Sequence, residues 1–170
     1  YINKIKSSEI FNVLSAKKII KIVEGGSTRK DSVLNGVVET KKSNNIVCIH
    51  DAARPFLKES FINDTVSSCD DFDGAIVAIP STDTIKIVNN GVVIKSLDRE
   101  IVWRAQTPQT FRKDKLIKSF KVQSKIKITD ECTMMELSGY SIKIIKGDPE
   151  NFKITSRHDW ELAKTKASDK

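Results

Sequence analysis

The sequence predicts a single α/β domain built on a largely parallel β-sheet. Short runs rich in Ile and Val alternate with segments in which apolar residues recur at helical spacing, and this alternation is typical of α/β proteins. With 170 residues, 39% of them hydrophobic, the chain is long enough for one sizeable core and too short for two. We therefore expect one domain, residues 1–170, with one inserted element.

Four runs predict strands, each followed by polar, proline or glycine residues: 19–23, 46–49, 75–79 and 142–145. Two helices between them are predicted from apolar residues that share one helical face. These residues are Val33, Leu34, Val37 and Val38 within 32–39, and Phe61, Ile62 and Val66 within 58–68. A last helix is predicted to begin near Ser156, because Asp159 follows three residues later, as in a capping box.

Residues 84–99 interrupt the alternation. Two β-branched runs, 84–88 and 92–97, flank Asn89-Asn90-Gly91. An Asn-Gly pair between such runs predicts a β-hairpin. A two-stranded arm cannot bury its apolar residues alone, so we expect this one to pair with a second subunit.

The amino-acid composition limits the kinds of ligand and partner that the protein is expected to bind. The 29 Lys and Arg against 22 Asp and Glu give a net charge of +7, which favours anionic ligands in general, but most lysines are dispersed as on a solvated face. Aromatic residues make up 6% and show no RNA-binding spacing, so no nucleic-acid partner is expected. Three separated cysteines indicate a reducing compartment, and no apolar run reaches the roughly 18 residues of a membrane span. We expect a cytoplasmic protein without a membrane partner.

Ligands of open α/β sheets bind beyond the carboxyl ends of the strands, so the residues that follow each predicted strand are the first candidates for a binding site. Gly25-Gly26 leads to Ser32 near a helix start, a pattern that also suits an ordinary turn with a helix cap. Asp51 and Arg54 are separated by two alanines, which leaves a small-walled cleft or, more simply, a local ion pair. His50 is expected to be a structural hydrogen-bonding residue.

Three later segments carry polar groups. Residues 103–111 predict an extended loop around a Thr-Pro step, with Trp103 and Phe111 packed beneath it. Thr129-Asp130-Glu131 predicts a helix start, where acidic residues are favourable. Lys153 follows the strand 142–145 and is expected at the same sheet edge as Arg54.

Taken in order, these segments resemble the 2-C-methyl-D-erythritol 4-phosphate cytidylyltransferase family. The strings that carry the resemblance span about residues 23–159 and read Gly-Gly…Arg-x-Asp-Ser-Val, His-Asp-Ala-Ala-Arg-Pro, Asp-Thr-x-Lys, Arg-x-x-x-Trp-x-Ala-Gln-Thr-Pro-Gln-x-Phe, Thr-Asp-Glu and Asn-x-Lys-Ile-Thr. The resemblance implies a Rossmann-like fold of the nucleotide-diphospho-sugar transferase type with a dimerisation arm. It also implies transfer of a cytidylyl group from CTP to a polyol phosphate, with Mg²⁺ held mainly by the substrate phosphates.

The resemblance also implies roles for individual residues. The nucleotide would be contacted by Gly25, Gly26, Ser32 and Ala52. The polyol phosphate would be bound by Asp51, Arg54, Thr107 and Lys153, of which Asp51, Arg54 and Lys153 would be catalytic. Thr84 and Arg99, on either flank of the hairpin, would reach the partner subunit's site, so the active protein would be a homodimer.

One part of the family pattern is missing. The family begins with a strand and a glycine-rich loop that holds the triphosphate, whereas residues 1–16 contain no Gly. We therefore expect the domain to be incomplete at its amino terminus and, by itself, inactive. A plastid location would require a transit peptide in the preceding segment.

Two alternative functions stay open. One is a ribitol-5-phosphate cytidylyltransferase, which the paired alanines before Arg54 disfavour. The other is a non-catalytic dimerisation or RNA-binding relic, which the retained charged residues disfavour.

Overall fold

The computed structural model describes residues 5–9, 11, 21–124 and 128–168. It divides into two compact units, Tyr1–Asn44 and Asn45–Lys170, and each is described by itself. The assignment of a single domain to residues 1–170 stays a prediction.

The smaller unit contains the helix α3, Arg29–Val38. Thr28 caps it: the Thr28 hydroxyl accepts from the Asp31 amide at 3.1 Å, and the Asp31 carboxylate accepts from the Thr28 amide at 3.1 Å. This reciprocal capping box starts the helix three residues before the predicted position. Val37 is buried, whereas Val38 is 55% exposed, so the predicted apolar face is only partly covered by the described residues.

The strand predicted at 19–23 is not found in its described part. Ile19 and Ile20 lie outside the described residues, and residues 21–26 have no regular secondary structure. An apolar, β-branched run becomes a strand only where its backbone pairs with a neighbouring strand. In the part of the chain that the structure describes, this segment has no such neighbour.

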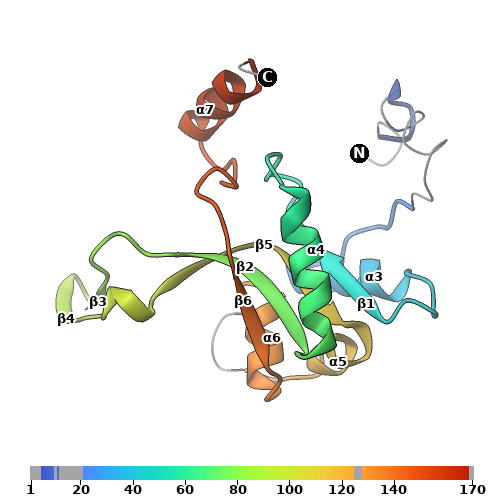
Figure 1. Cartoon of the computed structure of the whole chain (residues 1–170), viewed down its shortest axis with the longest axis horizontal. Coiled ribbons are helices and arrows are strands. Elements are labelled where there is room, and N and C mark those ends of the chain that lie inside the picture. Colours follow the sequence, from blue (N-terminus) through green and yellow to red (C-terminus); the bar gives the residue numbers. More distant parts are fainter. Residues whose placement is uncertain (1–4, 10, 12–20, 125–127, 169–170) are drawn as a thin grey trace. The chain divides into compact units, whose positions relative to one another are not determined.

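The larger unit is built on a four-stranded sheet in the order β1-β5-β2-β6 (Figure 1). The strands are β1 Ile46–Ile49, β2 Gly74–Pro80, β5 Trp103–Arg112 and β6 Ile142–Lys146. β2 and β6 are parallel, and β5 runs antiparallel to both β1 and β2. Three strands therefore share one direction, as the α/β pattern predicts, and the fourth makes the sheet mixed.

That fourth strand corrects the loop predicted at 103–111. β5 lies between β1 and β2, and its residues from Gln106 to Phe111 are buried. Two of its buried polar side chains bond to distant segments: Gln109 Nε2 donates to Asp130 Oδ2 at 2.9 Å, and Thr110 Oγ1 donates to Thr65 Oγ1 at 2.9 Å. Phe111 is fully buried as predicted, but Trp103 is 40% exposed and does not pack beneath the segment.

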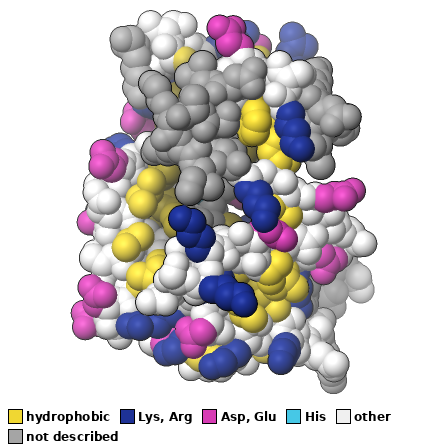
Figure 2. Space-filling model, turned by 90° about the vertical axis from the view of Figure 1, so that its right-hand side faces the viewer, with side chains coloured by type: hydrophobic (Ala, Val, Ile, Leu, Met, Phe, Trp, Pro, Cys, Tyr) yellow, Lys and Arg dark blue, Asp and Glu magenta, His cyan; other side chains and the backbone are white. Residues whose placement is uncertain are grey.

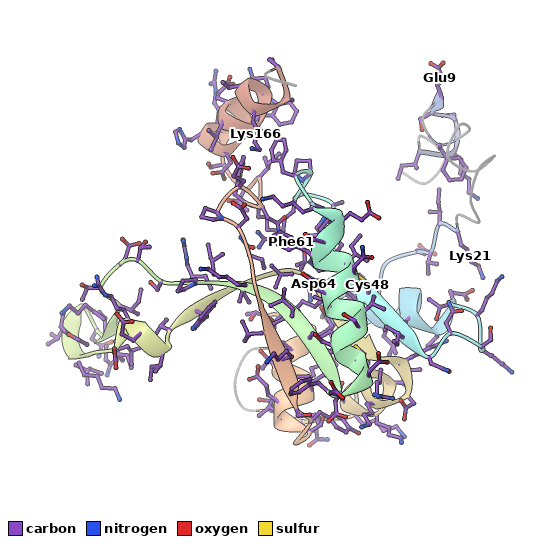
Figure 3. The ribbon with its side chains drawn as sticks, viewed as in Figure 1. Glu9, Lys21, Cys48, Phe61, Asp64 and Lys166 are labelled. Carbon is purple, nitrogen blue, oxygen red and sulfur yellow. The ribbon has the colours of Figure 1, made fainter. Side chains whose placement is uncertain are left out.

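The remaining helices pack on this sheet or follow its strands. They are α4 Glu59–Ser67, α5 Lys113–Ser119, α6 Glu131–Leu137 and α7 Arg157–Ser168, with short 3₁₀ turns η1 Ser68–Asp70 and η2 Arg99–Ile101. α4 packs along β5 and β2, and its Phe61 is buried (Figure 3). The predicted face of α4 is shifted, since Thr65 is fully buried and Val66 is 36% exposed. No described helix combines the length and apolarity needed to cross a membrane.

Two helix starts agree with the sequence prediction. Asp130 caps α6 by accepting from the Thr133 amide at 3.0 Å. At α7, the Ser156 hydroxyl accepts from the Asp159 amide at 3.2 Å, and the Asp159 carboxylate accepts from the Ser156 amide at 2.8 Å. Backbone and hydroxyl hydrogen bonds from Thr155 and Ser156 lower the pKa of Asp159 to about 2.

The predicted hairpin is present as β3, Lys86–Asn89, and β4, Val92–Ser96. Asn89 pairs with Val92, and the two turn residues, Asn90 and Gly91, have φ values of 48° and 79°. Positive φ at both positions is what a two-residue turn in a twisted hairpin requires. The arm extends away from the four-stranded sheet (Figure 1). All its strand residues are exposed, including Ile87 at 37% and Val92 at 69%.

The excess positive charge is distributed over the surface. Figure 2 shows Lys and Arg side chains on one face of the molecule among acidic and hydrophobic ones. Several lysines make exposed ion pairs, including Lys21 with Glu39, Lys118 with Asp114 and Lys164 with Glu161. Exposed pairs of this kind contribute little stability and fit the predicted solvated face.

Candidate functional site

Three charged side chains meet at the edge where β1 and β6 end. Asp51 and Arg54 follow β1, and Lys153 lies on the segment after β6. Asp51 Oδ2 is 3.0 Å from Lys153 Nζ and 3.4 Å from Arg54 Nε. The side chains of Asp51 and Arg54 are 17% and 11% exposed and so are largely desolvated, whereas the Lys153 side chain is 42% exposed. The structure thus brings together the three residues predicted to be catalytic.

The segment 50–54 is fixed to β5 by His50 and Thr107. His50 Nε2 lies 2.9 Å from the Arg54 carbonyl oxygen, which can only accept, so Nε2 carries the proton. The Thr107 hydroxyl lies 2.9 Å from His50 Nδ1 and accepts from the Asp51 amide at 3.1 Å. Both ring nitrogens of His50 are therefore used in positioning Asp51 and Arg54, which agrees with its predicted structural role.

The segment after β6 is held against the same edge. The Gly147 amide donates to the Ala78 carbonyl at 2.8 Å, and the Ile154 amide donates to the Ala53 carbonyl at 2.8 Å. A Cβ atom on Gly147 would lie 2.4 Å from Gln106 Oε1 and 2.6 Å from Val77 Cγ1, so the chain can pass there only with glycine. These contacts place Lys153 beside Asp51.

Asn151 is a structural part of the site that the sequence did not single out. Its side chain is 1% exposed, and Nδ2 donates to the Thr107 carbonyl at 2.8 Å and to Gln106 Oε1 at 3.4 Å. Its own carbonyl accepts from Arg54 Nη1 at 2.7 Å. Asn151 was visible in the string Asn-x-Lys-Ile-Thr, but only the folded chain shows that it joins Arg54 to β5.

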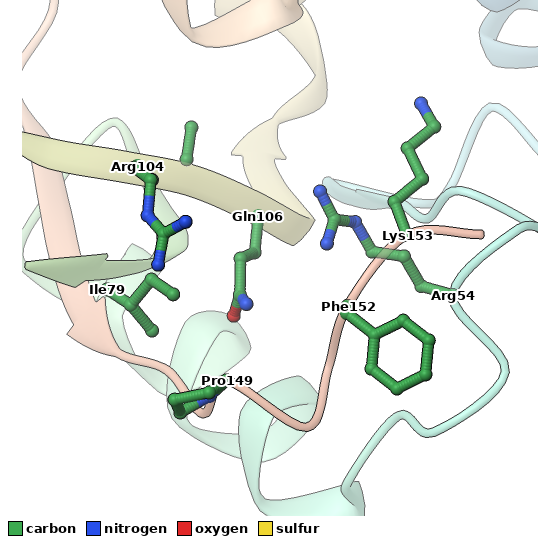
Figure 4. A pocket seen from close by; sticks show the side chains of 8 residues that line it. Arg54, Ile79, Arg104, Gln106, Pro149, Phe152 and Lys153 are labelled. Atoms are coloured by element: carbon green, nitrogen blue, oxygen red, sulfur yellow. The ribbon is translucent and has the colours of Figure 1, made fainter. Parts of the chain in front are cut away.

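A cleft of about 300 Å³ opens beside these residues (Figure 4). It is lined by Arg54, Ile79, Arg104, Ala105, Gln106, Pro149, Phe152 and Lys153. Three of the lining side chains are cations and none is a carboxylate, so the cleft favours an anionic ligand with an apolar portion. Arg104 was not predicted as a site residue, because a single arginine in a segment taken for a loop carried no signal.

One rim of the cleft is stabilised by a separate ion pair. Lys58 Nζ lies 2.5 Å from Asp148 Oδ2, and Asp148 Oδ1 accepts from the Glu150 amide at 2.8 Å. These hydrogen bonds lower the pKa of Asp148 below its usual value, with the bond from Lys58 the larger cause. The Asp148 carbonyl in turn accepts from Gln106 Nε2 at 2.9 Å. The rim is therefore tied to the wall of the cleft.

Thr84 and Arg99 do not join this cluster within the chain. Thr84 precedes β3 and is exposed, and Arg99 lies in η2 with its side chain 57% exposed, 3.7 Å from Glu100. Neither makes a hydrogen bond or ion pair with the cleft residues among the described part of the chain. Their predicted role in the partner subunit stays a prediction.

The predicted nucleotide residues divide between the two units. Within residues 1–44, the Gly26 amide donates to Ser32 Oγ at 3.0 Å, and Ser32 Oγ donates to the Thr28 carbonyl at 2.9 Å. A Cβ on Gly26 would lie 2.3 Å from Asp31 Cβ, so this glycine lets the turn pack on the first residues of α3, whereas Gly25 is exposed in that turn. Ala52 is exposed beside Asp51 in the larger unit.

The fold and the cleft define an α/β domain with a cationic binding site at its strand ends. A family model described as 2-C-methyl-D-erythritol 4-phosphate cytidylyltransferase matches residues 2–167. The chain belongs to this family.

Similar proteins and a similar solved structure support the assignment to this family. The chain is 39% identical over 148 residues to 2-C-methyl-D-erythritol 4-phosphate cytidylyltransferase from Clostridioides difficile strain 630, covering 86% of this chain and 62% of that protein. It is 40% identical over 161 residues to the enzyme of the same name from Haemophilus influenzae strain PittGG, covering 93% and 71%. The crystal structure of 4-diphosphocytidyl-2C-methyl-D-erythritol synthase from Anaerococcus prevotii matches with a TM-score of 0.84 at 28% identity, covering 94% and 76%. The chain thus spans about three fifths of the Clostridioides difficile relative.

Proposed function

We propose that the chain forms the greater part of a cytidylyltransferase that joins CTP and 2-C-methyl-D-erythritol 4-phosphate. The products would be 4-diphosphocytidyl-2-C-methyl-D-erythritol and pyrophosphate, a step in the non-mevalonate supply of isoprenoid precursors. The observation that carries the proposal is the convergence of Asp51, Arg54 and Lys153 beside a cationic cleft in a chain of this family.

The reaction requires two anions to approach. A phosphate oxygen of the polyol phosphate attacks the α-phosphorus of CTP, a P–O bond forms, and the bond to the departing pyrophosphate breaks. Lys153 and Arg54 would offset the negative charge, and Asp51 would hold both cations in position before substrate arrives. Direct displacement needs no covalent nucleophile on the protein.

Thr107 would act chiefly through its neighbours. Its hydroxyl is engaged with His50 and the Asp51 amide, so it fixes the backbone at Asp51. On the nucleotide side, Gly25, Gly26, Ser32 and Ala52 are proposed as contacts of the cytidine, supported by family membership.

Mg²⁺ is proposed as the cofactor. Among the residues that the structure describes, no cluster of three or more His, Cys, Asp or Glu could hold a metal ion alone. An ion that is held mainly by substrate phosphates and water needs no such cluster. The bound ion would neutralise phosphate charge during transfer.

The test is a substrate comparison in the complete polypeptide that contains these 170 residues. With CTP and Mg²⁺, pyrophosphate release should be much faster with 2-C-methyl-D-erythritol 4-phosphate than with ribitol 5-phosphate. Equal or faster release with ribitol 5-phosphate would favour the alternative cytidylyltransferase. No release with either substrate from a folded protein would favour a non-catalytic relic.

We also propose that the hairpin arm forms a homodimer in which Thr84 and Arg99 reach the partner's site. Val92, Val93 and Ile94 are 69%, 57% and 61% exposed, so they form an apolar surface that the described residues do not cover. Mixing an Arg99→Ala protein with an Arg54→Ala protein tests this: one hybrid site would regain both arginines, and activity should exceed the sum of the two variants. An absence of recovery with proven heterodimers would confine Arg99 to its own chain.

A further inference from the structure

The Arg104 side chain differs from the other two cations of the cleft in having no hydrogen-bonded or ion-paired partner among the described residues. Arg54 and Lys153 share the Asp51 carboxylate, and Arg54 also donates to the Asn151 carbonyl. Arg104 is exposed, and its side chain makes no hydrogen bond or ion pair with any described residue. Because no carboxylate lines the cleft, the Arg104 charge is not offset there and is available to a ligand.

The position of Arg104 is set by β5. It pairs with Ile79 of β2, and Gln106 lies two residues further along the same strand. In Figure 4 the Gln106 side chain lies between the guanidinium groups of Arg104 and Arg54. The two arginines therefore approach one cleft from opposite sides of a shared wall.

That wall is rigid. Gln106 is 5% exposed, its Nε2 donates to the Asp148 carbonyl, and its Oε1 accepts from Asn151 Nδ2. Arg54 is likewise fixed by its bond of 2.7 Å to the Asn151 carbonyl. A ligand would meet one immobilised guanidinium and one, Arg104, that can turn towards it.

The lining indicates what kind of ligand this would be. A guanidinium group offers paired N–H donors that match a phosphate, and an unpaired arginine can bind one in bidentate geometry. Ile79, Pro149 and Phe152 supply apolar surface for a short carbon chain. A volume of about 300 Å³ is at the small end for ligand sites and suits a phosphorylated polyol.

We propose that Arg104 is a substrate-binding residue that contacts the phosphate of the acceptor polyol phosphate. This inference rests on the proposed function and adds a residue to its acceptor site. Arg104 supplies affinity for the acceptor, whereas Lys153 and Arg54, held by Asp51, supply charge at the site of transfer.

The experiment compares Arg104→Gln and Arg104→Lys with Arg157→Gln, a control that removes an exposed arginine outside the cleft. In the complete polypeptide, Arg104→Gln should raise KM for 2-C-methyl-D-erythritol 4-phosphate by about 10-fold, the scale of one charge-assisted contact, with kcat and KM for CTP within about 2-fold. Arg104→Lys should raise KM for 2-C-methyl-D-erythritol 4-phosphate less than Arg104→Gln does. Arg157→Gln should behave as the unchanged protein.

A direct measurement of acceptor binding does not depend on turnover. Calorimetric titration with 2-C-methyl-D-erythritol 4-phosphate should show the same loss of affinity for Arg104→Gln, and unphosphorylated 2-C-methyl-D-erythritol should bind both proteins equally weakly. Unchanged acceptor affinity, or a rise confined to KM for CTP, would overturn the inference. An unchanged protein that neither binds nor converts the acceptor would instead refute the proposed function.

Discussion

Asn151→Asp should be the substitution that most clearly tests how the site is held together. The orientation of the Asn151 amide follows from its partners: Gln106 Nε2 is bound to the Asp148 carbonyl, so Gln106 presents Oε1, an acceptor, to Asn151 Nδ2. The Thr107 carbonyl is the second acceptor, at 2.8 Å. Aspartate replaces the donor by an oxygen of almost the same shape, which would face two acceptors.

The loss of folding stability in Asn151→Asp depends on whether the introduced carboxyl group is ionised. Asn151 is 1% exposed, and its Oδ1 already lacks a hydrogen-bond partner among the described residues. An ionised carboxylate there would be a buried charge opposed by two carbonyl oxygens, which costs on the order of 3 to 5 kcal/mol. The neutral acid could donate its proton to the Thr107 carbonyl, so at low pH we expect the loss to fall to about 1 kcal/mol.

The sign of the pH dependence follows from linkage. Burial and the two acceptors raise the pKa of the introduced carboxyl in the folded state above its unfolded value near 3.9. The folded protein then binds more protons than the unfolded one between these two pKa values. The free energy of unfolding of the variant, relative to the unchanged protein, should therefore fall by about 1.4 kcal/mol per pH unit from about pH 4 until the folded-state pKa is passed, and then level off.

Urea unfolding of both proteins at pH 4, 5, 6, 7 and 8 measures this difference. Asn63→Asp, at an exposed position of α4, is the matched control and should stay within about 0.5 kcal/mol at every pH. If Asn151→Asp were within about 1 kcal/mol of the unchanged protein at pH 8, with no trend, the amide would not be held between two acceptors. The same result would arise if Arg54 compensated the new charge, and Arg54→Ala in the variant would then restore the trend.

Three further outcomes are expected. Lys153→Ala in the complete polypeptide should lower kcat about 100-fold and raise KM less, because its ammonium acts mainly in the transition state; a change confined to KM would refute that role. Asp73→Asn should lower the free energy of unfolding by about 1 kcal/mol at pH 7, since Lys115 and Ser141 lower the pKa of Asp73. This stability is present above the unfolded pKa and is lost as pH falls through the lowered folded pKa, so in urea unfolding the difference between the two proteins should shrink as the pH is lowered below about 4, and a constant difference would refute the pairing. An NMR titration of Asp159 should give a pKa of about 2, and Thr155→Val, which removes the hydroxyl donor and keeps the backbone amide, should raise it; an unchanged value would show that the Thr155 hydroxyl does not donate to Asp159.

Much of the site was predictable because its residues follow strands that local patterns reveal. The runs at 46–49, 75–79 and 142–145 became β1, β2 and β6 within one residue. Strands that share one direction end at one edge, so Asp51, Arg54 and Lys153 were expected together and lie together. The hairpin and the caps at Asp130 and Ser156 were also predictable, since turn and capping chemistry acts within a few residues.

Other features depend on segments far apart in the chain. β5 contains Gln106, Thr107, Pro108 and Gln109, a composition typical of a loop, and it is a central strand because β1 and β2 pair with both of its edges. On α4, Thr65 rather than Val66 is buried, because its hydroxyl accepts from Thr110 of β5.

The sequence by itself determined which residues are polar, charged or apolar along each element, and so where the strands end and which charges follow them. Tertiary structure alone decided which buried polar groups find partners, because those partners come from distant segments. Asn151 bonds to residues 44 and 45 positions away in β5. Among the described residues, the Arg104 side chain is left without a partner although a second arginine lies across the same wall. The spacing of apolar residues along the sequence indicates on which face of an element a side chain lies. Whether a buried polar side chain finds a hydrogen-bond partner depends on how the whole chain folds.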